Sequence, residues 1–395
     1  MTFNYHQKGA SYMKELSNKV AKAPRSKIRE LMDLAAGKKD IISLGIGQPD
    51  FSTPDPAIEG NINALRNNIT CYAPTRGIPE LLQEIETKLK RFNNIQSNWN
   101  ENIILSNGGS QALTLAYATL FNPGDELILS SPNFISYFYC SLFFGVKVIE
   151  IRRNDDFSTN IEAMERAITD KTKAILINSP NNPTGHAMNS EELKKIIELV
   201  KEYDLYLISD EVYENYLYDG FKHASPASFD GMFDRTVTIN AMSKLYSATG
   251  FRLGYVVAKK EIIDLMEKYH QYTAAGTNHA AQYGFLEALK MDQHFFDNIL
   301  ESFNKRRLFV HERLKELNFD VVKPKGAFYI MPSVSGFNMN GAEFSERVMR
   351  EKGVAIVPGN VFGSYSEDRI RISYATAYSQ LVEAFDRIEK FILML

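Results

Sequence analysis

Short apolar runs that alternate with helical patterns are the feature that most limits the folds open to this chain. Six such runs follow one another between residues 102 and 240, and helical spacing separates several of them, most clearly at Leu193, Ile196, Ile197 and Val200. Nearly continuous apolar strands between helices are typical of a mainly parallel sheet that is covered on both faces. The predicted strands are 102–106, 126–129, 147–151, 174–178, 205–209 and 236–240.

The C-terminal part of the chain has a different pattern. From about Leu286, a long helical stretch precedes four strand-like runs, at residues 319–322, 326–330, 354–357 and 369–373. This order favours a smaller α+β domain. Residues 26–36 have the spacing of an amphipathic helix that ends at Gly37, and we expect this N-terminal segment to join the smaller domain. The predicted division is 1–45 (arm and part of the small domain), 46–285 (large domain) and 286–395 (small domain).

Length and composition exclude several classes of protein. A chain of 395 residues is longer than one hydrophobic core usually supports, which agrees with a large and a small domain. The formal net charge of -3 argues against a dedicated nucleic-acid binder. Two cysteines, Cys71 and Cys140, are too few for a disulfide scaffold or a multi-cysteine metal site, so we expect reduced thiols and no metal.

No segment predicts export or membrane insertion. Residues 1–10 are polar and show no signal peptide. The most apolar stretch, residues 134–146, is shorter than the roughly 20 residues that a membrane helix needs. We therefore expect a soluble, cytoplasmic protein without a membrane partner.

Polar side chains follow several of the predicted strands, where ligands collect in an open parallel sheet. After 102–106, the turn Gly108-Gly109-Ser110-Gln111 opens a helix and offers free N–H groups and a hydroxyl to an anion such as phosphate. This turn matches neither a dinucleotide-binding pattern nor a P-loop, and on its own it is more often structural. After 174–178, Asn182 in NSPNNPTG can offer its amide to a ligand oxygen.

The next two strands are followed by residues of opposite charge. Asp210 and Tyr213 in SDEVY follow 205–209, and a buried acid at this point needs a cationic partner. Lys244 follows 236–240. A desolvated lysine has a lowered pKa and a nucleophilic neutral amine, although a lone lysine in a loop is usually solvated. Arg252 adds a permanent charge that suits phosphate.

The last strand-like run contains two arginines. Arg369 and Arg371 in RIRISY share one face of a strand, so the spacing leaves open which of them binds a carboxylate, and both are also compatible with solvated edge charges. A phosphate cradle, a second cation, an acid for a ring nitrogen, a phenol and an amide for a ring hydroxyl, and an amine are together the groups that pyridoxal phosphate requires. Their joint occurrence at strand ends favours a site for this cofactor.

The chain resembles the pyridoxal-phosphate-dependent aminotransferases of class I/II, in the fold type I group, over nearly its whole length. The resemblance implies an α/β fold whose large, cofactor-binding domain has a mainly parallel, seven-stranded sheet between helices, plus the smaller α+β domain. The matching motifs are ISLGIGQPDF (42–51), YAPTRGIPEL (72–81), NGGSQAL (107–113), NSPNNPTG (178–185), LISDEVY (207–213), SKLYSATGFRLGY (243–255), KGAFYI (325–330), VPGNVFG (357–363) and RISYAT (371–376).

This resemblance implies a transaminase (EC 2.6.1.-) that moves an amino group between an L-amino acid and a 2-oxo acid by a ping-pong reaction. Lys244 matches the lysine that forms the internal aldimine and then acts as general acid and base. Asp210 is expected to keep the pyridine nitrogen protonated. Tyr213 and Asn182 are expected to hydrogen-bond the ring hydroxyl oxygen.

Other implied contacts hold the cofactor's phosphate and ring. Phe134 matches an aromatic residue that lies against the ring, although packing in the core would also explain it. Ala241 is a departure, because many relatives have serine there; Ser243 is expected to take over part of that role. The expected phosphate ligands are Gly109, Ser110, Gln111, Ser243 and Arg252.

The resemblance also implies how the substrate binds and how subunits cooperate. Arg371 matches the arginine that binds the substrate α-carboxylate, with the Gly47 backbone and Asn182 beside it. Tyr72 resembles a residue that reaches the cofactor phosphate of a neighbouring subunit, which implies a homodimer with shared active sites.

One alternative reaction stays open. A carbon–sulfur β-lyase uses the same fold and cofactor, and both reactions begin with the same carbanion. An aminotransferase-like sensor domain of a transcription regulator is disfavoured, since no DNA-binding segment precedes the domain. The motifs do not identify the substrate side chain; Tyr12, Tyr272 and Phe362 are the hints of an aromatic or long apolar substrate.

Overall fold

The computed structural model describes residues 16–23 and 40–395. The predicted helix at 26–36 and Tyr12 lie outside the described residues. In the described part, seven strands form a central sheet in the order β2-β8-β7-β6-β5-β3-β4, and its neighbours are parallel except where β8 pairs with β2 and β7. The strands are β2 (Ile103–Ser106), β3 (Glu126–Ser131), β4 (Lys147–Arg152), β5 (Thr172–Asn178), β6 (Tyr206–Asp210), β7 (Thr236–Ala241) and β8 (Gly254–Val257).

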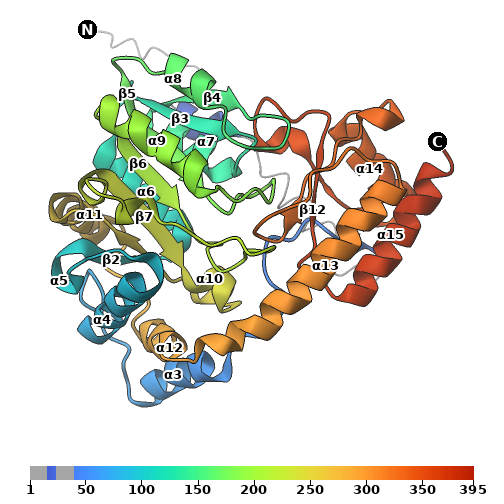
Figure 1. Ribbon diagram of the computed structural model, residues 1–395. Helices are drawn as coiled ribbons and strands as arrows, with labels where there is room; N and C mark the ends of the chain where they lie inside the picture. Colours follow the sequence, from blue (N-terminus) through green and yellow to red (C-terminus); the bar gives the residue numbers. More distant parts are fainter. Residues whose placement is uncertain (1–15, 24–39) are drawn as a thin grey trace, which may run out of the picture.

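Helices cover both faces of this sheet, which confirms the predicted architecture (Figure 1). In β3, for example, Leu127 and Leu129 pack on one face with α6 and α7, while Ile128 packs on the other face with α9. The helices around the sheet are α3 (Asp55–Arg66), α4 (Pro79–Lys88), α5 (Trp99–Asn102), α6 (Gly108–Leu120), α7 (Ile135–Phe144), α8 (Ile161–Arg166), α9 (Ser190–Glu202), α10 (Met242–Leu245), α11 (Lys260–Thr273) and α12 (His279–Leu289), and a short α1 (Asn18–Ala21) precedes them.

The C-terminal part builds two small sheets. Strand β1 (Ile42–Ser43) pairs in parallel with β10 (Val354–Ala355), so residues just before the large sheet lie with the C-terminal part. The second sheet is antiparallel, in the order β11 (Val357–Pro358), β12 (Ile370–Ser373) and β9 (Tyr329–Ile330). The helices here are α13 (Asp297–Glu316), α14 (Gly341–Lys352) and α15 (Tyr378–Ile392). The predicted division at residues 45 and 285 stays a prediction.

Three strand predictions for this part are corrected. Residues 319–322 form no strand: only Asp320 makes an isolated bridge, because Phe319 packs into the core and Pro324 soon follows. The run 326–330 shortens to β9. The run 354–357 splits into β10 and β11, because Val354 pairs with β1 whereas Val357 pairs with β12.

The long helix α13 connects the two parts. Figure 1 shows it running from beside α12 toward α15. Its buried residues, among them Phe303 and Val310, pack in the same core as Tyr213 and Tyr216, which follow β6. This shared core holds the C-terminal part against the carboxyl ends of the central strands.

Candidate active site

The predicted site residues gather where the central strands end. Asn178 at the end of β5 lies opposite Asp210 at the end of β6, and Asp210 lies opposite Ile239 near the end of β7. The cavity beside these ends has a volume of about 210 Å³. All predicted site residues except Gln111 and Tyr72 line it: Gly47, Gly109, Ser110, Phe134, Asn182, Asp210, Tyr213, Ser243, Lys244, Arg252 and Arg371.

The start of α6 and Arg252 form one end of the cavity. Gly108 has φ +75°, and a Cβ there would lie 2.7 Å from Arg252 Nη2, so only glycine lets the arginine approach this turn. Arg252 Nη1 donates to the Thr249 carbonyl at 3.1 Å. Within the part of the chain that the structure describes, no side-chain hydrogen bond caps α6, so its first N–H groups are available to an anion.

Gln111 supports this turn instead of lining the cavity. Its Oε1 accepts the backbone N–H of Asn107 at 2.7 Å, and its Nε2 lies 3.2 Å from Nδ1 of the buried His270. The Gln111 side chain therefore holds the shape of the turn. Any contact of Gln111 with a phosphate would come from its backbone.

Asp210 is a buried carboxylate with neutral donors. The Tyr137 hydroxyl donates to Oδ2 at 2.7 Å, and the Val212 N–H donates to Oδ1 at 3.2 Å. Burial raises the pKa of Asp210 to about 6, although both hydrogen bonds oppose the rise. A buried carboxylate of this kind is stabilised by a cation, which a protonated ring nitrogen would provide.

Lys244 stands on α10, directly after β7. Its Nζ donates to the Gly47 carbonyl at 2.5 Å. Burial and the charge of Arg371, with a smaller effect of Arg252, lower the pKa of Lys244 to about 8, against the opposing effect of Asp210. About a tenth of this amine is therefore neutral, and nucleophilic, at pH 7, whereas a lysine of ordinary pKa is well below 1% neutral there.

Burial distinguishes Arg371, which lies in β12, from Arg369, which directly precedes β12. Arg371 is buried under the rings of Tyr329 and Phe362, at 4.7 and 4.9 Å. Arg369 instead lies over Phe157, and its Nη1 donates to the Met331 carbonyl at 3.2 Å. Arg371, and not Arg369, lines the cavity.

Arg371 keeps a donor free. Its Nη1 donates to Asn182 Oδ1 at 3.1 Å, and its Nη2 donates to the Gly45 carbonyl at 2.6 Å. Its Nε is buried and has no hydrogen-bond partner among the described residues. A buried orphan donor is costly, and a carboxylate would satisfy it.

Sequence reasoning missed two tyrosines of the site. Tyr137 donates to Asp210, and its ring meets Phe134 edge-on at 5.6 Å. The Tyr329 hydroxyl lies 3.0 Å from that of Tyr213. Tyr137 comes three residues after Phe134 on the first turn of α7, which is the signal that could have found it.

These observations show that the residues present fit pyridoxal phosphate. The buried Asp210 carboxylate would be stabilised by a cation, the start of α6 with Arg252 offers an anion site, and Lys244, an amine of lowered pKa, lines the same cavity. The Nε of Arg371, which has no partner among the described residues, would suit a carboxylate.

Comparisons with known proteins give the same result. Residues 39–388 match the family model described as aminotransferase class I and II. The chain belongs to this aminotransferase family. It is 42% identical to an aspartate aminotransferase of Pyrococcus abyssi, over 92% of this chain and 95% of the relative, and 39% identical to aromatic-amino-acid aminotransferase 2 of Thermococcus litoralis, over 95% and 97%. A crystal structure of an aromatic aminotransferase from Pyrococcus horikoshii superposes with a TM-score of 0.88 at 39% identity, and covers 93% of this chain and 99% of its own.

This aminotransferase uses pyridoxal 5'-phosphate and catalyses transamination between an amino acid and a 2-oxo acid.

Within the described ranges, its helices are all too short or too polar to cross a membrane. Tyr72, which does not line the cavity, has 88% of its surface exposed.

The lowered pKa of Lys244 predicts a definite pH dependence for uptake of the cofactor through this amine. Because only the neutral form of an amine is nucleophilic, the rate constant for uptake by the cofactor-free aminotransferase should rise about tenfold for each pH unit below 8 and then level off. Stopped-flow absorbance across pH 6 to 10 measures this rate. A rate that still rises tenfold between pH 9 and 10 would indicate an ordinary, solvated lysine.

Proposed function

We propose that Lys244 is the amine that binds the cofactor and that Asp210 holds the ring nitrogen. The observation that carries this proposal is the shared cavity: a partly buried amine of lowered pKa and a buried carboxylate whose hydrogen-bond donors are neutral both line it. Arg252 and the start of α6 would hold the phosphate, with Ser243 nearby, and Phe134 would lie against the ring. Tyr213 and Asn182 would contact the ring hydroxyl oxygen.

When bound, pyridoxal phosphate supplies a ring that withdraws electrons from the substrate Cα. Residues of the chain hold the ring nitrogen and move the proton. Asp210 holds its negative charge against the ring nitrogen above a pH of about 6. Once its amine is released, Lys244 takes the proton from the substrate Cα, and a pKa of about 8 suits a group that accepts and donates a proton near neutral pH.

In this proposal, Arg371 binds the substrate. Its guanidinium would grip the α-carboxylate of the amino acid and satisfy the free Nε, while Asn182 and the Gly45 carbonyl fix its orientation. A grip on the α-carboxylate orients the Cα bond that is to be broken. The backbone of Gly47, whose carbonyl accepts from Lys244, lies at the same end of the cavity.

The working unit in this proposal is a homodimer with shared sites. Tyr72 and Tyr272 are 88% and 91% exposed, and the segments that carry them approach one another, since a Cβ on Gly276 would lie 3.6 Å from the Ala73 carbonyl. Large exposed aromatic side chains of this kind suit a subunit contact.

Two free cysteines, Cys71 and Cys140, support a cytoplasmic location.

The donors to test are those named for the relatives, L-aspartate and the aromatic L-amino acids. With 2-oxoglutarate as acceptor, we expect at least one of these donors to yield L-glutamate, and no product without the acceptor. Glutamate formation followed by chromatography measures this. Release of ammonia and pyruvate from an amino acid without an acceptor would instead support the β-lyase reaction.

A further inference from the structure

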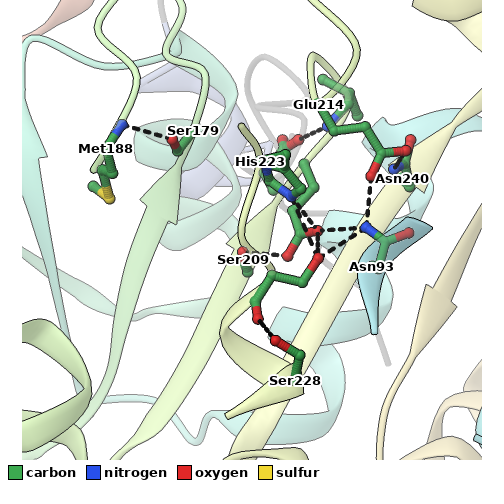
Figure 2. Close-up of polar contacts among 12 residues, drawn as sticks. Asn93, Ser179, Met188, Ser209, Glu214, His223, Ser228 and Asn240 are labelled. Atoms are coloured by element: carbon green, nitrogen blue, oxygen red, sulfur yellow. Dashed lines mark hydrogen bonds and ion pairs between the residues drawn. The ribbon is translucent and has the colours of Figure 1, made fainter. Parts of the chain in front are cut away.

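A largely buried polar cluster contacts the end of β7, just before Lys244. We call Lys88, Asn93, Glu214 and Asn240 the Glu214 clamp. Figure 2 shows Glu214 between Asn93 and Asn240. Glu214 follows Tyr213 directly in sequence, and Asn240 lies four residues before Lys244.

Glu214 joins the two segments that carry the proposed reacting groups. Its Oε1 accepts from Asn240 Nδ2 at 2.7 Å, and Asn240 Oδ1 accepts the N–H of Ala241, also at 2.7 Å. Ala241 ends β7, and α10 with Lys244 begins at the next residue. The carboxylate after β6 therefore fixes the backbone from which Lys244 extends.

Buried charge keeps Glu214 in place. Lys88 donates to Glu214 Oε1 and, at 2.8 Å, to Asn93 Oδ1, while Asn93 Nδ2 donates to Glu214 Oε2 at 2.7 Å. Burial alone would lower the pKa of Lys88, but the charge of Glu214 raises it well above its usual range. The pKa of Glu214 is lowered by Lys88 in spite of its burial. The pair thus stays ionised at neutral pH.

Two further charged groups, Glu211 and His223, lie beside the Glu214 clamp, and Glu211 also accepts from Asn93 Nδ2 at 3.4 Å. Glu211 accepts from Ser209 and Ser225, and His223 Nε2 lies 2.8 Å from its Oε2. Burial opposes it, but the charge of Glu211 raises the pKa of His223, and the protonated form of His223 in turn lowers the pKa of Glu214. Glu214 is therefore free to serve the contact with Asn240.

A large cavity lies beside the Glu214 clamp. A second cavity, of about 930 Å³, is lined by Lys88, Glu214 and Asn240. Ala241 lines both this cavity and the active-site cavity. The segment that leads to Lys244 thus lies between two cavities, and it is held there by the fully buried Met242 and by the pairing of Asn240 and Ala241 with β8.

We propose that Glu214 is a positioning residue, which sets Lys244 relative to Tyr213 through its hydrogen bond to Asn240. The proposal rests on the proposed function, because it takes Lys244 as the amine that binds the cofactor. Buried ion pairs often contribute little net stability, and one of their attested roles is to fix a unique arrangement. Without the clamp, we expect the segment that carries Lys244 to shift relative to Tyr213. A weaker Tyr213 hydrogen bond to the ring hydroxyl oxygen stabilises the ionised form of that oxygen less, so the titration of the holoenzyme moves to higher pH.

The test is the pH titration of the holoenzyme's visible absorption, together with steady-state kinetics. In Glu214→Ala, we expect the midpoint of the titration to move upward by about one pH unit, and kcat to fall about tenfold with a smaller change in KM. The double variant Lys88→Met/Glu214→Gln removes both charges and keeps an amide oxygen for Asn240, so its midpoint should stay near that of the wild type.

Glu126→Ala is the matched control, since Glu126 is a buried glutamate paired with Lys147 at 2.9 Å at the start of β3, the opposite end of the sheet. A Glu214→Ala midpoint that moves no further than that of Glu126→Ala overturns the proposal, as does a double variant that shifts as much as Glu214→Ala. If Glu214→Ala does not fold, Asn240→Ala is judged by the same criterion. A wild type without a visible band that titrates would refute the proposed function itself.

Discussion

Replacing Lys244 with alanine is expected to lower kcat/KM for transamination by at least about 10⁴-fold, because the change removes both the nucleophile and the group that moves the Cα proton. Spectrophotometric assays of glutamate formation measure the loss. Lys259→Ala is the control, since Lys259 is partly exposed and lies 3.7 Å from Glu261 on the surface. Lys244→Ala enzyme that retained more than a few per cent of wild-type activity would contradict the assignment.

The same variant tests whether active sites are shared. In a mixture of Lys244→Ala and Tyr72→Ala chains, a hybrid dimer has one site with both an intact Lys244 and an intact Tyr72 from its partner. We expect the refolded mixture to be more active than the mean of its two components. Activity equal to that mean would show that Tyr72 acts within its own subunit or not at all.

Arg371→Leu is expected to raise KM for every amino acid donor by about 100-fold, because charge-assisted hydrogen bonds of about 1.5–3 kcal/mol each are lost from the α-carboxylate. Binding of the cofactor should change little, since Arg252 and α6 are untouched. Steady-state kinetics with the best donor, and equilibrium binding of pyridoxal phosphate, measure the two effects.

Arg369→Leu gives this prediction a control from the same segment of chain. Arg369 packs over Phe157 and does not line the cavity, so its loss should leave KM within about threefold of the wild type. An equal rise of KM in both variants would mean that the effect is one of stability. A larger rise in Arg369→Leu would assign the carboxylate to the other arginine.

The large sheet could be predicted because its strands are apolar on both faces. All six predicted strands are present, each within two residues of the predicted bounds. The pattern does not predict β8, because Gly254–Val257 is only four residues long and its first two residues belong to the family motif 243–255. The C-terminal strands were predicted less well because they are two to four residues long, and tertiary pairing, not local pattern, decides where they begin and end.

Many site residues could be predicted because they follow strands in the sequence. The remaining ones depend on three-dimensional packing. Alternation places Arg369 and Arg371 on one face, and only burial under Tyr329 and Phe362 distinguishes them. Tyr137 and Tyr329 were missed since 20 tyrosines and 25 phenylalanines leave no local signal for those in the site. The Glu214 clamp joins Lys88 to a strand end more than 120 residues away, a contact that no local pattern contains.

The most direct measurement is the identification of the lysine that carries the coenzyme. Purified enzyme is reduced with borohydride, digested, and its peptides are sequenced by mass spectrometry. The structure predicts that the reduced adduct is found on Lys244, in the peptide that follows β7. An adduct on any other lysine, or a protein that gives no adduct after incubation with pyridoxal phosphate, would contradict it.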